Sequence, residues 1–247
     1  MTSKARPAFI VVLAAAALTA SASAARSGSG VPPGGERALV PCGQETAAPF
    51  TSQQKYLFDI IRSRRTVRDF RPDPVPKEHI LKILDMARWA PTSGNQQPWK
   101  FLVVQDRDKL DLLKGRAVAW FLEDYEKRMK PAPEVLDQMR KQLPATMAKV
   151  LSAPVYVAVL TDSQSAYPPD NRYDGPLAAA LLMIAARALG YGTGFYTTYF
   201  PEARMREFLG IPERYNLVCF TPIGVPAEWP PAPPKKPLEE FVVFEKF

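Results

Sequence analysis

The sequence of 247 residues predicts a mixed α/β domain, in which helices lie between most of the strands. The first observation is a hydrophobic fraction of 47%, which is enough to build a core. The second is a set of short apolar runs of strand length, among them 100–104 and 155–160. The third is helical periodicity around these runs, over 107–150 and 178–189. We therefore expect a mixed central sheet flanked by helices.

The first expected helix begins at a capping sequence. Thr51 and Gln54 stand at the spacing of a capping box, in which each side chain accepts a hydrogen bond from the backbone of the other residue. Leu57 and Ile60 follow at helical spacing, and the helix should end near Arg64.

A second helix should start at Pro76, because proline is favoured in a first helical turn. Pro91 marks its end. The side chains expected on its buried face are Ile80, Leu81, Leu84 and Ala87.

The segment 107–150 is charged and helical in pattern. We expect proline to break it at Pro131, Pro133 and Pro144, because a proline lacks the amide hydrogen that continues a helix.

The next helix should be central and buried, since 178–189 is apolar nearly all round. Asp174 is its expected N-cap, Pro176 falls in its first turn, and Gly190 is its expected stop. Later strands are expected at 217–220 and 241–244.

Composition narrows the chemistry that the chain can perform. One histidine, His79, and two cysteines, Cys42 and Cys219, leave no His/Cys cluster for a structural zinc and permit at most one disulfide. The net charge of +7 is weak support for nucleic-acid binding, because small anionic ligands explain the excess equally well. If the chain is an enzyme, we expect a bound cofactor to carry the chemistry.

The N-terminus has the pattern of a targeting segment. Lys4 and Arg6 precede an apolar run over residues 7–20, and small residues follow up to position 24. We interpret residues 1–24 as a signal peptide or a membrane anchor, which favours an exported or anchored protein. An over-extended gene start, with a cytoplasmic protein, is the alternative. Residues 25–50 read as a flexible linker, and residues 51–247 as the folded domain.

Three guanidinium groups stand close together after the first helix. The segment Arg64-Arg65-Thr66-Val67-Arg68 lies at a helix-to-strand junction, where alternation in an extended chain points Arg64, Thr66 and Arg68 to one side. This arrangement suits a phosphate, which accepts paired hydrogen bonds from arginine. A solvated basic turn is the alternative.

A second polar segment, residues 90–99, connects a helix to a strand. Its Asn and Gln side chains offer both donors and acceptors, as the polar edge of a flavin ring requires. An ordinary polar connection is the alternative. A third segment, Gly190 to Gly194, follows a helix rather than a strand, so its glycines do not indicate a dinucleotide-binding fold.

Together these segments resemble the nitroreductase family of FMN flavoproteins over roughly residues 55–247. The motifs that carry the resemblance are R-R-T-V-R-D-F at 64–70, A-P-T-S-G-N-Q-Q-P-W at 90–99, A-A-R-A-L-G-Y-G-T-G at 185–194 and T-P-I-G-V-P at 221–226.

The resemblance implies a nitroreductase-like fold and an intertwined homodimer with FMN at the subunit interface. The residues implied for the phosphate and the pyrimidine side of the flavin are Arg64, Arg65, Thr66, Val67 and Arg68. Those implied to reach the flavin from the other subunit are Pro91, Thr92, Ser93 and Asn95. Those implied beside the flavin N5 are Tyr196, Thr197 and Thr198. Lys235 stands where the family usually has a phosphate-binding arginine.

The same resemblance implies an FMN-dependent oxidoreductase without a catalytic side chain of its own. NADH or NADPH would reduce the flavin, and a nitroaromatic, a quinone or a similar small electron acceptor would then be reduced at the same face, in ping-pong order. A non-catalytic flavin-binding protein and a flavin-fragmenting enzyme are alternatives.

The segment around Tyr125 resembles the lid of iodotyrosine deiodinases, which implies Tyr125 as a substrate contact and halotyrosine dehalogenation as a further alternative. Phe121 stands where that branch has a Glu, and Met147 falls near its Lys, with Lys149 close by. We therefore expect neutral aromatic acceptors, stacked beneath Trp120, Phe121 and Tyr125, to be preferred over iodotyrosine.

Overall fold

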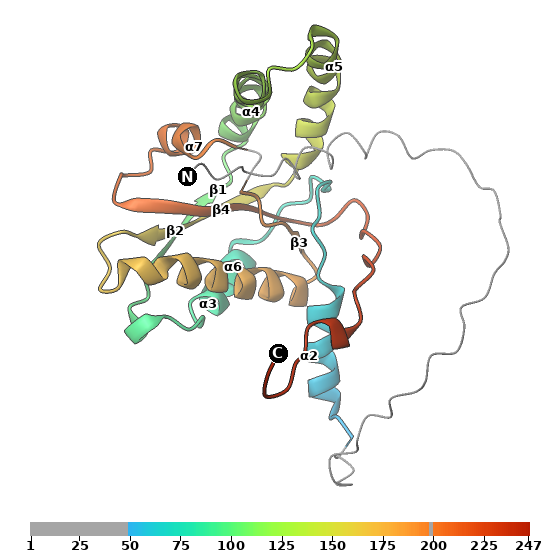
Figure 1. Ribbon diagram of the computed structural model, residues 1–247, viewed down its shortest axis with the longest axis vertical. Helices are drawn as coiled ribbons and strands as arrows, with labels where there is room; N and C mark the ends of the chain where they lie inside the picture. The colour runs from blue at the N-terminus through green and yellow to red at the C-terminus, as the bar shows by residue number, and fades with distance from the viewer. Residues whose placement is uncertain (1–48, 198–199) are drawn as a thin grey trace, which may run out of the picture. The chain divides into compact units, whose positions relative to one another are not determined.

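The computed structural model describes residues 49–197 and 200–247. At its centre is a four-stranded sheet in the order β1-β2-β4-β3 (Figure 1). The strands are β1 (Trp99–Val104), β2 (Val155–Asp162), β3 (Gly192–Thr193) and β4 (Tyr215–Gly224). Neighbouring strands pair antiparallel, and an isolated bridge joins Thr66 to Thr193 in the parallel direction.

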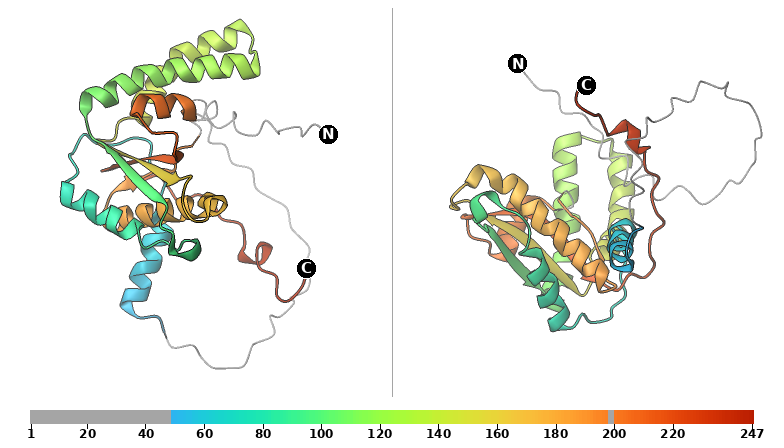
Figure 2. Two further views of the ribbon diagram at one scale, coloured as in Figure 1. Left: turned by 90° about the vertical axis from the view of Figure 1, so that its left-hand side faces the viewer. Right: turned by 90° about the horizontal axis from the view of Figure 1, so that it is seen from below.

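Helices cover both faces of this sheet (Figures 1 and 2). On one face lie α3 (Lys77–Ala87) and α6 (Asn171–Ala188). On the other lie α4 (Arg107–Met129), α5 (Pro133–Val150) and α7 (Glu202–Leu209). The predicted α/β architecture, with a central sheet flanked by helices, is confirmed. The sheet was expected to be mixed, but its strand pairs are all antiparallel, and the parallel direction occurs in the isolated Thr66–Thr193 bridge.

Strand β2 shows why two separate cores form. Its side chains alternate between the two faces of the sheet, and nearly all of them are buried. Val155, Val157 and Val159 pack with α3 and α6. Tyr156, Ala158 and Leu160 pack with α4, α5 and α7. A strand covered on both faces must be apolar throughout, as its sequence is.

Helix α2 (Ser52–Ser63) starts and ends as the sequence predicts. The Thr51 hydroxyl accepts from the Gln54 amide at 3.2 Å, and the Gln54 side chain accepts from the Thr51 amide at 2.8 Å. Arg64 is the C-cap, with an extended backbone. None of the residues of α2 is buried, and the helix points away from the sheet in Figure 1.

The predicted buried face of α3 is partly wrong. Ile80 and Ala87 are buried, but Leu81 is 56% exposed and Leu84 is only half-buried. The residue buried between them is Ile83, because a helix that touches the sheet along one line buries positions three and four apart.

Two expectations about prolines and caps are also corrected. Pro144 lies inside α5 and does not break it; the carbonyl that loses its amide partner belongs to the exposed Arg140, where water can replace the amide. Helix α6 begins at Asn171 after the short 3₁₀ turn Pro168–Asp170, so Asp174 lies in the first turn and is not the N-cap. Gly190 ends the helix as predicted, with φ of +85°.

The strand predicted at 241–244 is absent from the described chain, where this segment follows a 3₁₀ turn at Leu238–Glu240 without regular structure. Phe241 is 67% exposed and Phe244 is 82% exposed. A strand needs a neighbouring strand to satisfy its backbone groups, and this segment has none within the described chain. The β-branched, aromatic composition therefore did not suffice to form a strand.

Other expectations lie outside the described residues: the targeting segment, nearly all of the linker and Cys42.

Burial raises the pKa of the Cys219 thiol to about 12, so this thiol is inert at neutral pH. Over the part of the chain that the structure describes, no helix is long and apolar enough to cross a membrane.

The hydroxyl of Tyr156 is expected to contribute measurably to stability. It donates to the Val150 carbonyl at 2.8 Å and accepts from the Ala153 amide at 3.2 Å, and burial raises its pKa well above the usual value. Tyr156→Phe should lower the free energy of unfolding by about 1–3 kcal/mol, because both backbone groups lose their partner. Urea unfolding at pH 7 measures this, with the exposed Tyr173→Phe as control. Equal stability of the two variants would contradict the expectation.

Candidate functional site

A cavity of about 750 Å³ lies between the chain that follows α2 and the proline-rich segment that follows β4. This volume is within the usual range for a small-molecule site. We call it the arginine cavity. Its lining residues are Ile61, Arg62, Arg64, Arg65, Thr66, Arg68, Pro230, Pro231, Ala232, Pro233 and Lys235.

The extended chain after α2 sorts its side chains between core and cavity. Val67 is 1% exposed and its amide donates to the Thr193 carbonyl at 2.9 Å, so this side chain faces the protein. Arg64, Thr66 and Arg68 all line the cavity, as the predicted alternation requires. Gly192 makes this packing possible, since a Cβ there would lie 2.6 Å from a Val67 methyl group.

Arg65 departs from the alternation, because it also lines the cavity. Its Nη1 donates to the carbonyls of Arg62 at 2.6 Å and Arg64 at 2.9 Å. Its Nε is buried and has no hydrogen-bond partner in the described structure. A buried donor without an acceptor costs free energy, so this nitrogen indicates a place where a ligand acceptor would be favourable.

The charge of the lining is of one sign. It contains four arginines and Lys235, and no acidic residue. The hydroxyl of Thr66 adds a donor between them. Guanidinium and ammonium groups that converge in this way suit a phosphate or another anion, so the donor set fits the terminal phosphate of FMN.

The polar loop over residues 91–97 lies elsewhere, and contributes to neither this cavity nor the second one described below. It contains the 3₁₀ turn Ser93–Asn95, with Pro91 and Asn95 exposed and Thr92 and Ser93 half-buried. The Thr92 hydroxyl accepts from the Gln97 amide at 3.2 Å. One chain therefore does not bring these residues to the arginine cavity.

Gln96 anchors this loop to the rest of the fold, a role that the sequence patterns did not predict. Its Nε2 donates to the buried Asp174 carboxylate at 2.7 Å and to the Tyr167 carbonyl at 3.1 Å, and its Oε1 accepts from the Tyr167 amide at 2.7 Å. Asp174 thus anchors the loop to α6 instead of capping that helix. In the sequence, only the Asn-Gln-Gln run and an acidic residue far downstream point to this contact, and they indicate it weakly.

The three residues predicted beside the flavin N5, residues 196–198, do not come together in one site. The side chain of Tyr196 is 3% exposed and its hydroxyl donates to the Val67 carbonyl at 2.7 Å, so it supports the arginine-bearing chain from within the core. Thr197 is exposed and lines a second cavity. Thr198 lies outside the described residues.

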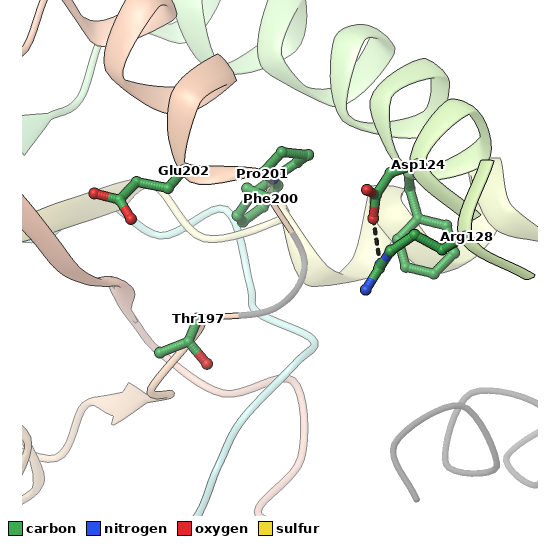
Figure 3. Close-up of a pocket in the computed structure, with 7 residues that line it drawn as sticks. Asp124, Arg128, Thr197, Phe200, Pro201 and Glu202 are labelled. Carbon is green, nitrogen blue, oxygen red and sulfur yellow. Dashed lines mark hydrogen bonds and ion pairs between the residues drawn. The ribbon is translucent and has the colours of Figure 1, made fainter. Parts of the chain in front are cut away.

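This second cavity, which we call the lid cavity, has a volume of about 320 Å³ (Figure 3). Its lining residues are Phe121, Asp124, Arg128, Thr197, Phe200, Pro201 and Glu202. Asp124 and Arg128 form an ion pair on α4, and the Glu202 carboxylate points away from that pair. The cavity therefore has charged as well as aromatic walls.

The aromatic lid expected from Trp120, Phe121 and Tyr125 forms only in part. Phe121 lines the lid cavity, and Tyr125 stacks on it with ring centroids 6.3 Å apart, outside the lining. Trp120 packs against Phe208 of α7 instead. Helices α4 and α7 are also joined by an ion pair between Glu123 and Arg204, at 3.2 Å.

The sequence model of the Nitroreductase family matches residues 61–225, which include the arginine-bearing chain and the whole sheet. The chain belongs to the Nitroreductase family. Membership confirms the family predicted from the motifs and makes the chain an oxidoreductase.

Relatives of this Nitroreductase-family protein differ in their named activities. The 5,6-dimethylbenzimidazole synthase of Rhodospirillum rubrum is 31% identical over 184 residues, covering 69% of this chain and 82% of that protein. The iodotyrosine deiodinase of Thermotoga neapolitana is 30% identical over 197 residues, covering 76% and 97%. A crystal structure of oxidized iodotyrosine deiodinase bound to FMN and 3-iodo-L-tyrosine is 26% identical, with a TM-score of 0.62, and covers 77% of this chain and 100% of that one.

Proposed function

We propose that this Nitroreductase-family protein is an FMN-dependent oxidoreductase that uses NADH or NADPH to reduce nitroaromatic, quinone or similar small acceptors. The observation that carries the proposal is the arginine cavity, with its five cationic side chains and the unpartnered Nε of Arg65. The structure of a related deiodinase bound to FMN supports the same cofactor.

The residues of the cavity would have distinct roles toward FMN. Arg64, Arg68 and Lys235 would hold the phosphate, and Thr66 with Arg65 would donate to the polar edge of the flavin. When bound, FMN supplies the hydride chemistry, and the protein orients the ring and excludes water. Reductant and acceptor would use one face in turn, which gives ping-pong kinetics.

A second subunit would complete the site. Pro91, Thr92, Ser93 and Asn95 lie apart from the arginine cavity of their own chain, so they would serve the cavity of a partner. Exposed apolar side chains on α2 and after residue 237 support such an assembly, because surfaces of this kind mark protein–protein contacts.

The positions that match the deiodinase clamp favour neutral acceptors over an amino-acid zwitterion. Phe121 has no charge to offer an ammonium group, and Met147 is fully buried in the core. Lys149 pairs with Asp69 at 3.6 Å and does not line the lid cavity. A zwitterion that loses its water without such partners costs several kcal/mol.

Halotyrosine dehalogenation is the second candidate function, and one observation in the lid cavity supports it. The Asp124–Arg128 pair places both signs of charge in the lid cavity, where they could face an ammonium and a carboxylate. A deiodinase relative at 30% identity supports the same alternative.

One anaerobic experiment tests these functions. We expect purified protein to be yellow, to release FMN rather than FAD, and to bleach when mixed with NADH or NADPH. A neutral nitroaromatic should restore the colour faster than 3-iodotyrosine under the same reductant. Faster reoxidation by iodotyrosine would favour the dehalogenase, and bound FMN that never bleaches would indicate a non-catalytic flavin-binding protein. A colourless protein that takes up no FMN would overturn the proposal.

A further inference from the structure

Arg187, near the end of α6, contacts both chain segments that carry the walls of the arginine cavity. Its Nε donates to the Ser63 hydroxyl at 3.0 Å, at the last residue of α2. Its guanidinium carbon lies 4.0 Å from the centroid of the Trp229 ring, immediately before the proline-rich wall. Arg187 itself is half-buried and does not line the cavity.

Backbone hydrogen bonds fix the start of the proline-rich segment against the chain that follows α2. The Arg71 amide donates to the Val225 carbonyl at 2.9 Å, and the Ala227 amide donates to the Asp69 carbonyl at 3.0 Å. Beyond Ala227 the wall contains Pro230, Pro231 and Pro233, which have no amide hydrogen. This part of the wall must therefore be placed largely by side-chain contacts.

The Ser63 contact fixes the other wall. The Ser63 hydroxyl accepts from Arg187 while it donates to the Ile60 carbonyl at 3.2 Å, so Arg187 is tied to the last turn of α2. The arginines that line the cavity lie on both sides of this residue, with Arg62 before it and Arg64, Arg65 and Arg68 after it. A change in the position of this turn moves them directly.

We propose that Arg187 is a positioning residue for FMN, which sets the gap between the two walls of the arginine cavity. The inference rests on the proposed function and assigns this side chain a role outside the lining. Arginine suits this role because its guanidinium lies over the indole ring of Trp229 while its Nε donates to the Ser63 hydroxyl, and a lysine has no second donor along its side chain for the second contact.

The test measures the dissociation constant of the dimer for FMN by quenching of flavin fluorescence. Arg187→Met should raise it roughly 5- to 30-fold, as expected for loss of a partly buried cation–π contact and a hydrogen bond. Trp229→Ala should do the same, and Trp229→Phe should restore most of the affinity because it keeps an aromatic face. The double variant Arg187→Met/Trp229→Ala should bind FMN no more weakly than whichever single variant has the larger loss, since both substitutions remove the same contact between Arg187 and Trp229.

Arg172 provides the matched control on the same helix. Its guanidinium carbon lies 4.6 Å from the ring centroid of Tyr173, away from both walls of the cavity. Arg172→Met removes the same charge and a similar contact, and should leave FMN affinity unchanged. Thermal unfolding of each apoprotein checks folding, and Ser63→Ala gives a second test if Arg187→Met does not fold.

The outcomes separate this inference from the proposed function. Wild-type protein that binds no FMN refutes the function. Wild-type protein that binds FMN, with Arg187→Met binding equally well, refutes only the positioning role. Additive losses in the double variant, or equal losses in Arg172→Met, would also refute it, because they indicate a general effect on stability or charge.

Discussion

Arg68→Ala is expected to raise the dissociation constant for FMN roughly 10- to 150-fold, the equivalent of about 1.5–3 kcal/mol for a charge-assisted hydrogen bond. Arg68 lines the arginine cavity on the same side as Arg64 and Thr66, and no carboxylate shares that lining. The difference between variant and wild type should shrink as salt is added, because counter-ions screen the attraction of a partly solvated site for phosphate.

Arg71→Ala is the control for this substitution. Arg71 is exposed, pairs with Asp73 at 2.8 Å and lies outside the cavity lining, three positions along the chain. It removes the same charge from the same region, so FMN affinity should stay close to that of wild type. Unchanged flavin occupancy in Arg68→Ala, or equal losses in the two variants, would remove Arg68 from the proposed site.

Local rules of the chain predicted one wall of this cavity but not its partner. The capping box at Thr51 fixes where α2 starts, and alternation in the extended chain after Ser63 places Arg64, Thr66 and Arg68 on one side. These relations act over a few residues. The opposite wall is formed by residues 230–235, far along the sequence, and only the family resemblance predicts Lys235 there.

The predictions that the structure contradicts failed for one physical reason, which is that each depends on a contact with residues far away in the sequence. Asp174 looked like an N-cap because carboxylates favour that position, but its partner is Gln96, which a local pattern cannot show. Leu81 and Ile83 are equally apolar, and only the line of contact with the sheet decides which is buried. The strand expected at 241–244 depends on a pairing partner that residues 49–197 and 200–247 do not supply.

The second large effect is expected when the chain is truncated after Ala227. It concerns the proposed second subunit as well as the cofactor. The truncated protein should lose both dimerisation and FMN, because it lacks the proline-rich wall, Lys235 and the exposed apolar residues up to Phe247. It retains the backbone pairing of Phe70 with Pro226 and both buried cores, since neither core includes a residue beyond Val225. We therefore expect a folded, colourless monomer.

Sedimentation or light scattering gives the mass, circular dichroism gives the helical content, and absorbance gives the bound flavin. The full-length variant Lys235→Met separates the two losses, because it keeps every apolar residue and should remain a dimer with weakened FMN binding. A truncated protein that stays dimeric would show that α2 and the sheet flanks suffice for assembly. A truncated monomer that still holds FMN would refute both the second wall and the need for a partner's loop, because the arginines that follow α2 would then bind the cofactor alone.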